Sequence, residues 1–302
     1  MHRRYTLDEV KRKIVDVLQS AGGMGLSGME LADRTGINRM TITKYLDVMN
    51  AMGLLKKKKM GPVNVWVLES GVGDIEFPVN YVQVQQKLIA ALLAGEEEQS
   101  RKILVSVLNS DVDQVRVLTD VIIPASNTIA ELYSRGRLDK TERAFLTSLM
   151  MELVDLAKFN AHPVEQKANA NAIFVSGSED KLFLTKCASV AFQILGWDSI
   201  YIGNVEQQID PFFDIDFQRH ISRVWADRRG LMVICIFSSG EGALKFLSST
   251  SRAMKGRVKG ELRIAVSATP ELQQAAEESS DFVARDLSSL AEWAEREYNA
   301  RK

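Results

Sequence analysis

Apolar positions in the first 70 residues recur every three or four residues and then give way to two short strand-like runs. The first spacing predicts amphipathic helices and the second predicts a hairpin. The expected helices are Tyr5–Ser20, Ser27–Thr35 and Arg39–Met52, and the expected strands are Leu54–Met60 and Val63–Leu68. Gly36 separates the second and third helices, where a tight turn with positive φ is accessible mainly to glycine. This order predicts a winged helix-turn-helix domain over residues 1–70.

Capping residues and inward faces support these helix boundaries. Thr6 and Glu9 have the spacing of a capping box at the start of the first helix. Asn38 is a favourable N-cap for the third helix. The residues expected to face the core of the second and third helices are Met29, Leu31, Ala32, Ile42, Leu46 and Met49.

The opposite side of the third helix carries side chains that suit a major groove. Arginine, lysine and threonine reach phosphates and base edges when a recognition helix enters that groove. Consecutive lysines on the first strand of the hairpin provide positive charge for the DNA backbone. The residues expected to contact double-stranded DNA are Asn38, Arg39, Thr41, Thr43, Lys44, Lys56, Lys57, Lys58 and Lys59. The alternative is a winged helix used only for protein contacts.

Residues 71–160 change to a purely helical pattern after a linker. The linker, residues 71–79, is rich in glycine and contains proline. Helices are expected at Val82–Ala94, Glu96–Asn109, Asp111–Tyr133 and Asp139–Phe159, and Pro124 is expected to kink or divide the third of them. Residues 80–160 are therefore predicted to form a four-helix bundle.

After a second linker, residues 161–171, strands alternate with helices. Strands are expected at Ala172–Ser176, Ser199–Ile202, Leu231–Phe237, Leu262–Val266 and Phe282–Ala284. Helices are expected at Glu179–Leu195, Asp214–Arg228, Gly242–Met254, Pro270–Glu278 and Leu287–Ala300. Five β-α units predict a Rossmann-like, doubly wound parallel sheet of five strands over residues 172–302. The fold class is thus multidomain: an α+β head, a helical bundle and an α/β domain.

Charge and composition add a polarity to this layout. The 302 residues have a net charge of −1, but residues 1–70 carry 12 lysines and arginines against 7 aspartates and glutamates, and the remainder carries 26 against 32. A basic head on an acidic body suits a protein that presents one end to a polyanion.

Cys187 and Cys235 lie in apolar segments and are expected to be buried thiols. No apolar run is long enough to span a bilayer, so we expect a cytoplasmic protein.

Four residues of the helical segment, Pro124, Tyr133, Gly136 and Glu142, stand at places that match the pattern of a known helical cap. With this cap and the α/β pattern that follows it, residues 80–300 resemble a cobalamin-binding module. The order of head, cap and α/β domain is similar to that of the cobalamin-dependent photoreceptor repressors. The resemblance implies a DNA-binding transcriptional regulator, a homodimer or tetramer, whose C-terminal module controls oligomerisation in response to a ligand.

The chain departs from that family at the residues that hold cobalamin. In the family's D-x-H-x-x-G motif, Asp180 stands at the histidine position and Phe183 at the glycine position. Tyr133-Ser134 replaces the Trp-His pair of the cap, and Ser267-Ala268 replaces the double glycine after the fourth strand. The histidines of the chain, His2, His162 and His220, fall at no matching place. A carboxylate is a poor substitute for imidazole on cobalt, so we expect no cobalamin and no bound cofactor. The alternative is base-off binding of cobalamin without a ligand from the protein.

Three alternatives remain for the pocket of the α/β domain. It binds another small molecule, it binds haem through His162 or Cys187, or it is filled and the module only dimerises. The residues expected to line a ligand site are Tyr133, Ser178, Asp180, Ser238 and Ser239. An enzyme is not expected, because a corrinoid-linked methyltransferase subunit needs the missing histidine. A dinucleotide-dependent enzyme would need a G-x-G-x-x-G loop after the first strand.

Overall fold

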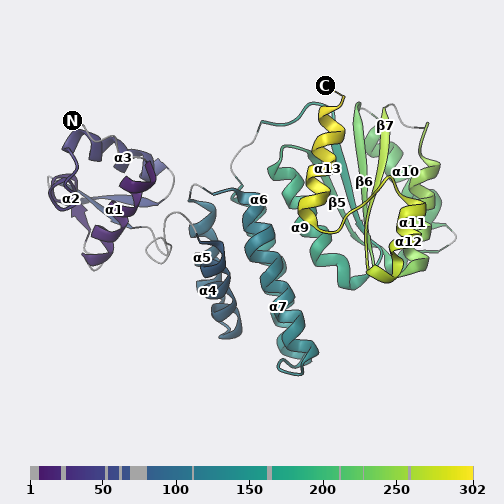
Figure 1. The fold of residues 1–302 in the computed structure, drawn as a ribbon, viewed down its shortest axis with the longest axis horizontal. Helices are drawn as coiled ribbons and strands as arrows, with labels where there is room; N and C mark the ends of the chain where they lie inside the picture. The colour runs from purple at the N-terminus through teal and green to yellow at the C-terminus, as the bar shows by residue number, and fades with distance from the viewer. Residues whose placement is uncertain are drawn as a thin grey trace. The chain divides into compact units, whose positions relative to one another are not determined.

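The computed structural model describes two compact units, Met1–Asn160 and Ala161–Lys302 (Figure 1). The first contains the head and the helical bundle, and the second contains the parallel sheet. No described helix is both long and apolar enough to cross a membrane. The described residues are 7–21, 25–51, 54–60, 63–68, 80–110, 112–161, 165–210, 212–226, 228–257 and 260–301.

The head is a winged helix-turn-helix domain. Its helices are α1 (Leu7–Ser20), α2 (Gly28–Thr35) and α3 (Arg39–Ala51), and its strands are β1 (Leu26–Ser27), β2 (Leu55–Met60) and β3 (Val63–Leu68). The strands form an antiparallel sheet in the order β1-β3-β2. The buried core consists mainly of Val10, Ile14, Leu18, Leu31, Ile42, Leu46, Met49, Leu54, Leu55 and Trp66.

One expectation for the head was wrong, one strand was not predicted, and two expectations lie outside the described residues. Met29 is 55% exposed, because α2 directs Leu31 and Ala32 inward and Met29 lies off that side. The pattern of apolar positions did not predict β1, whose two residues pair with Trp66 and Val65 of β3. The Thr6 cap and the Gly61-Pro62 turn are not among the described residues.

The helical bundle follows the expected order, but its third helix is built differently. The helices are α4 (Tyr81–Leu93), α5 (Glu97–Leu108), α6 (Gln114–Arg116), α7 (Ile123–Ser134) and α8 (Lys140–Phe159), with a π-helical segment, η2 (Val117–Ile122), between α6 and α7. Asp113 caps α6, so this helix begins later than Asp111. Pro124 lies in the first turn of α7, where its missing N–H does little harm, and the helix is divided by the π-helical segment before it.

The second unit is a five-stranded parallel sheet in the order β5-β4-β6-β7-β8. Its strands are β4 (Ala170–Ser176), β5 (Asp198–Asn204), β6 (Leu231–Ser238), β7 (Glu261–Ala268) and β8 (Phe282–Val283). Its helices are α9 (Leu182–Ile194), α10 (Phe213–Trp225), α11 (Glu241–Ala253), α12 (Gln273–Ser279) and α13 (Leu287–Asn299), with short 3₁₀ turns at Glu179–Lys181, Glu206–Gln208 and Pro270–Leu272. Strand β5 is added on one side of β4, and β6, β7 and β8 are added on the other side, so the direction of winding reverses between β4 and β6, as in doubly wound folds.

Helices cover both faces of this sheet, as the doubly wound prediction requires. Helices α9 and α13 lie on one face, and α10, α11 and α12 lie on the other (Figure 1). Every residue of β4 and β6 is buried, which explains why both strands are apolar on both faces. The α9 face is filled by an aromatic series in which Phe192 contacts Phe174 and Trp197, and Trp197 contacts Tyr298.

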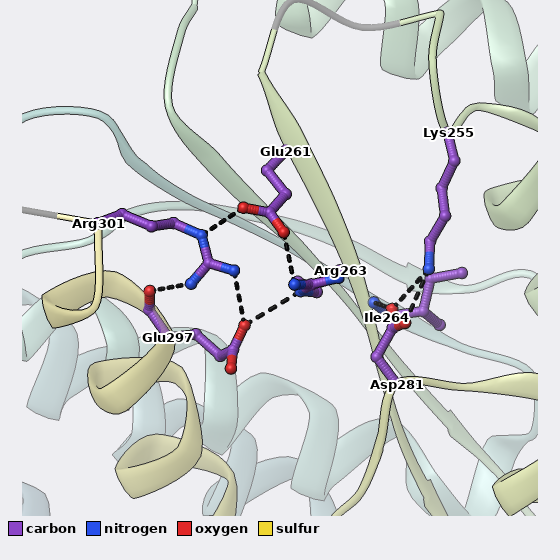
Figure 2. A network of polar contacts seen from close by, with 7 residues as sticks. All are labelled: Lys255, Glu261, Arg263, Ile264, Asp281, Glu297 and Arg301. Carbon is purple, nitrogen blue, oxygen red and sulfur yellow. Dashed lines mark hydrogen bonds and ion pairs between the residues drawn. The ribbon is translucent and has the colours of Figure 1, made fainter.

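A polar network joins the start of β7 to the last turn of α13 (Figure 2). Arg301 donates to Glu261 and Glu297, and Arg263 pairs with the same two carboxylates. Beside it, both Asp281 carboxylate oxygens accept from Lys255 at 2.8 Å, and one of them accepts from the Ile264 amide at 2.7 Å. The hydrogen bond from Arg301 holds the pKa of Glu261 below its usual range, although partial burial opposes this effect.

We predict that Glu261→Gln loosens the last turn of α13 at neutral pH. A carboxylate with a lowered pKa contributes stability that is present at neutral pH and is lost as the pH falls through that pKa. Removing a solvent-screened pair of this kind destabilises by roughly 0.2–1 kcal/mol. Hydrogen–deuterium exchange of peptides from Leu287–Asn299 should therefore be faster in the variant at pH 7.

The same difference should shrink as the pH falls through the lowered pKa of Glu261, because the wild-type side chain then also takes up a proton. Glu292→Gln, at an exposed position of α13, serves as the matched control and should leave the exchange unchanged. Equal exchange in wild type and Glu261→Gln at pH 7 would show that the network does not anchor the helix.

Candidate functional site

Two features fix α3 in the head: the N-cap before its first turn and the burial of its inward side chains. The Asn38 side chain accepts a hydrogen bond from the Met40 amide at 2.9 Å, which confirms the expected N-cap. Ile42, Leu46 and Met49 are at most 1% exposed, which confirms the expected inward face. Because Asn38 is used as a cap, its oxygen already has a partner before any DNA is bound.

The other side of α3 is open to solvent. Arg39, Thr43 and Lys44 are exposed as expected, and the Thr43 hydroxyl donates to the Arg39 carbonyl at 2.9 Å. Thr41 is half-buried, so its side chain is less accessible than those of Arg39, Thr43 and Lys44.

Sequence reasoning missed three further exposed residues on α3: Met40, Asp47 and Asn50. The sequence contained the information needed to predict their exposure, because at helical spacing they lie opposite or beside the apolar residues Ile42, Leu46 and Met49. Met40 was overlooked because an apolar residue is usually assigned to the core.

The lysines of β2 do not form one strip. All four are exposed, but their cross-strand partners divide them between two faces of the wing. Lys57 and Lys59 lie opposite Trp66 and Asn64, and Lys56 and Lys58 lie opposite Val67 and Val65. The Lys57 ammonium lies 5.2 Å from the centroid of the Trp66 ring. One DNA duplex that lies against the wing would therefore meet mainly one pair.

Four of the five expected ligand residues come together at the carboxyl ends of β4 and β6. The Ser239 hydroxyl donates to Asp180 at 2.6 Å, and the Ser239 amide donates to the Ser178 hydroxyl at 3.0 Å. Ser238 accepts from the Gly240 amide at 3.1 Å. We call these four residues, Ser178, Asp180, Ser238 and Ser239, the strand-end cluster. It lies where the strand order reverses, which is the usual ligand position in open α/β sheets.

The strand-end cluster is closely packed. A Cβ at Gly177 would lie 3.1 Å from the Ser238 hydroxyl oxygen and 3.0 Å from the Ala243 Cβ. Partial burial raises the pKa of Asp180, but hydrogen bonds from the Ser239 and Ser178 hydroxyls outweigh it and hold the pKa below its usual range. Asp180 is therefore a carboxylate at neutral pH.

The fifth expected ligand residue, Tyr133, lies on α7 in the first unit. The Arg143 guanidinium of α8 lies 4.3 Å from the centroid of its ring, so one face of the ring is covered from within the bundle. Such a cation–π contact gives Tyr133 a packing role.

The described residues do not fit the cobalt of cobalamin. The strand-end cluster offers hydroxyl and carboxylate oxygens, whereas cobalt favours an imidazole nitrogen. His220, on α10, has its Nδ1 3.3 Å from Arg223. His162 lies outside the described residues, so its expected role as a haem ligand stays a prediction. Among the described residues, no group of three histidines, cysteines or acids could hold a metal ion.

The two cysteines are buried, as expected. Cys187 on α9 and Cys235 on β6 are free thiols, and burial raises the pKa of each well above its usual range. A thiol kept protonated in this way is a poor haem ligand, because the thiolate is the ligand form.

An open cavity of about 340 Å³ lies at the opposite, amino-terminal end of the sheet. Arg228, Arg229 and Asp198 contribute to its wall, and an Arg228 nitrogen lies 2.7 Å from the Asp198 carboxylate. Periodicity and spacing did not predict this cavity, because it is formed by loops that precede three separate strands.

We predict that Ser239→Ala raises the pKa of Asp180 toward the ordinary value of about 3.9. The variant loses the hydroxyl donor that favours the carboxylate, so the stability that ionised Asp180 contributes at neutral pH should decrease. A ¹³C NMR titration of the aspartate carboxyl groups measures the shift. Ser249→Ala, at an exposed position of α11, is the control. An unchanged titration of Asp180 would contradict the role given to Ser239.

Comparison with known families and structures matches two segments of the chain. A family described as an HTH domain matches residues 10–61, and one described as a B12 binding domain matches residues 84–158. No curated protein matches the chain. The chain therefore joins an N-terminal HTH domain to a segment of B12-binding type.

Among solved structures, the chain is similar to the monomethylamine corrinoid protein of Methanosarcina barkeri, with a TM-score of 0.55 and 9% identity over 71% of this chain and 98% of that one. A cobalamin-binding protein from Desulfitobacterium hafniense DCB-2 aligns over 72% of this chain and 98% of that one at 12% identity, with a TM-score of 0.36. At 9% identity, the likeness to the monomethylamine corrinoid protein shows a shared fold alone. The TM-score of 0.36 is too low for the second likeness to support an argument.

Proposed function

We propose that this protein is a DNA-binding transcriptional regulator. The observation that supports it best is the outward side of α3, where Arg39, Thr43 and Lys44 are exposed at the start of the second helix of an HTH domain. A recognition helix contacts base edges with its N-terminal residues. The exposed lysines of β2 supply the phosphate contacts that give such proteins much of their affinity.

The C-terminal module, in this proposal, serves oligomerisation and small-molecule sensing. A homodimer or tetramer places two recognition helices on two half-sites of a duplex, about one helical turn apart. The regulator acts in the cytoplasm and is not an enzyme.

We further propose that the module works without cobalamin. The support is the chemistry of the strand-end cluster, in which Asp180 stands where the resembled family has histidine and is already hydrogen-bonded to Ser239. Phe183 replaces the glycine of the same motif and is half-buried at the start of α9.

A corrinoid-binding protein is the second candidate. The observations that favour it are the B12 binding domain match over residues 84–158 and the fold shared with a corrinoid protein. In this alternative a corrinoid would bind without a histidine ligand from the loop after β4.

Two sets of variants test the DNA-binding proposal. Arg39→Ala combined with Lys44→Ala should weaken binding to a selected DNA sequence by roughly 30-fold or more, because each of the two contacts to a base edge contributes about 1–3 kcal/mol. Replacing Lys56–Lys59 with glutamine should weaken binding to all sequences. The slope of log affinity against log salt concentration should fall by about one unit for each lysine that no longer neutralises a phosphate.

Pairwise variants provide the matched comparison. Lys56→Gln with Lys58→Gln changes one face of the wing, and Lys57→Gln with Lys59→Gln changes the other, at equal loss of charge. One of the two pairs should account for most of the decrease in the slope of log affinity against log salt concentration. Lys245→Gln on α11, outside the head, should have no effect. Wild-type affinity and salt dependence in both sets of variants would remove the DNA-binding proposal.

Visible absorption tests the proposal that cobalamin is not bound. Protein purified from its own host should be colourless, and protein incubated with aquacobalamin and then dialysed should retain no corrinoid bands. Asp180→His, which restores an imidazole to the loop after β4, is the informative variant. Corrinoid bands in the wild type would favour the second candidate, and retention by the variant alone would identify the missing imidazole as the cause.

A further inference from the structure

Met40 is the most exposed of the large apolar side chains that the structure describes, with 85% of its surface open. Single exposed apolar residues are common on proteins, so exposure alone assigns no role. Its position is what distinguishes it: Met40 is the second residue of α3 and follows Arg39 directly.

Helix geometry places Met40 at the centre of the outward side. Ile42, Leu46 and Met49 define the buried direction of α3. At about 100° per residue, Met40 points about 150° away from the mean of these three. Thr43 and Lys44 follow it by three and four residues and are therefore its neighbours on the same surface.

The chemistry of methionine narrows what it can recognise in a major groove. Its side chain is flexible and polarisable and has no group that donates a hydrogen bond. The donor and acceptor pattern of the base edges is therefore left to the exposed polar side chains of α3, among them Arg39, Thr43 and Lys44. The distinctive apolar feature in the groove is the C5 methyl group of thymine.

We propose that Met40 determines specificity by packing on the C5 methyl group of a thymine. This inference rests on the proposed DNA-binding function and adds to it the kind of base that α3 selects. Each half-site then contains a thymine beside the bases that Arg39 and Lys44 contact. A protein contact through Met40 is the competing explanation, and removal of single thymine methyl groups separates the two.

The experiment uses the full chain and a duplex that the wild-type protein selects from a randomised DNA library. Each thymine of that duplex is replaced singly by deoxyuridine, which removes the C5 methyl group and leaves the hydrogen-bonding edge intact. One replacement in each half-site should weaken binding of the wild type by about fourfold, the effect expected for one buried methyl-sized group.

The variants complete a double-mutant cycle. Met40→Ala should bind the thymine and deoxyuridine duplexes equally, whereas Met40→Leu, which keeps an apolar side chain, should retain a preference for thymine. Because Met40 is exposed, neither variant should change the circular dichroism spectrum.

The outcomes distinguish this inference from the function on which it rests. If the wild type selects no sequence, the DNA-binding proposal fails and the inference fails with it. If the wild type binds its selected duplex but no deoxyuridine replacement matters, or if wild type and Met40→Ala respond equally, the inference alone is overturned. Loss of oligomerisation in Met40→Ala with an unchanged thymine preference would assign the side chain to a protein contact.

Discussion

Burial of three side chains on one side of α3 is the constraint on which the head depends. Ile42, Leu46 and Met49 are at most 1% exposed, and only one rotation of the helix about its axis buries all three. That same rotation turns Met40, Thr43 and Lys44 outward. One rotation of α3 about its axis therefore decides both which side chains stabilise the head and which side chains are available for recognition. A polar residue at any of the three inward positions would disturb the recognition surface without belonging to it.

In the α/β unit, burial on both faces of the central strands has a comparable effect. Residues of β4 and β6 are buried throughout, so polar side chains are brought together beyond their carboxyl ends. The strand order reverses between β4 and β6, and the helices that follow these two strands lie on opposite faces of the sheet. This separation leaves room for the loops that carry Asp180 and Ser239, which are 59 positions apart in the sequence and joined by a hydrogen bond.

Periodicity alone predicted most of this fold, and the failures have a common cause. Helices such as α3 and α8 and strands such as β6 were predicted because their burial pattern is continuous over several turns or residues. Strand β1 was missed because two residues carry no periodicity and their pairing with β3 is tertiary. Met29 was misplaced because α2 is short and its inward side is narrow. For the strand-end cluster, the strand ends were predictable from the parallel topology, but the hydrogen bonds that close it depend on loop conformations that spacing does not encode.

The polar groups of the two candidate sites differ in what satisfies them. On α3 and β2, charged side chains such as Arg39, Lys44 and Lys58 are exposed, so water and counterions surround them and binding a polyanion releases those counterions. At the strand ends, Asp180 and Ser239 satisfy one another. A ligand that separated them would have to break this bond, which contributes about 0.5–1.5 kcal/mol. Asp180 is exposed, so water can take the place of the Ser239 hydroxyl and the cost of separation stays within this range. An effector that acts through Asp180 therefore gains affinity by bringing its own hydrogen-bond donor, and the bond between Asp180 and Ser239 does not by itself close the site to a ligand.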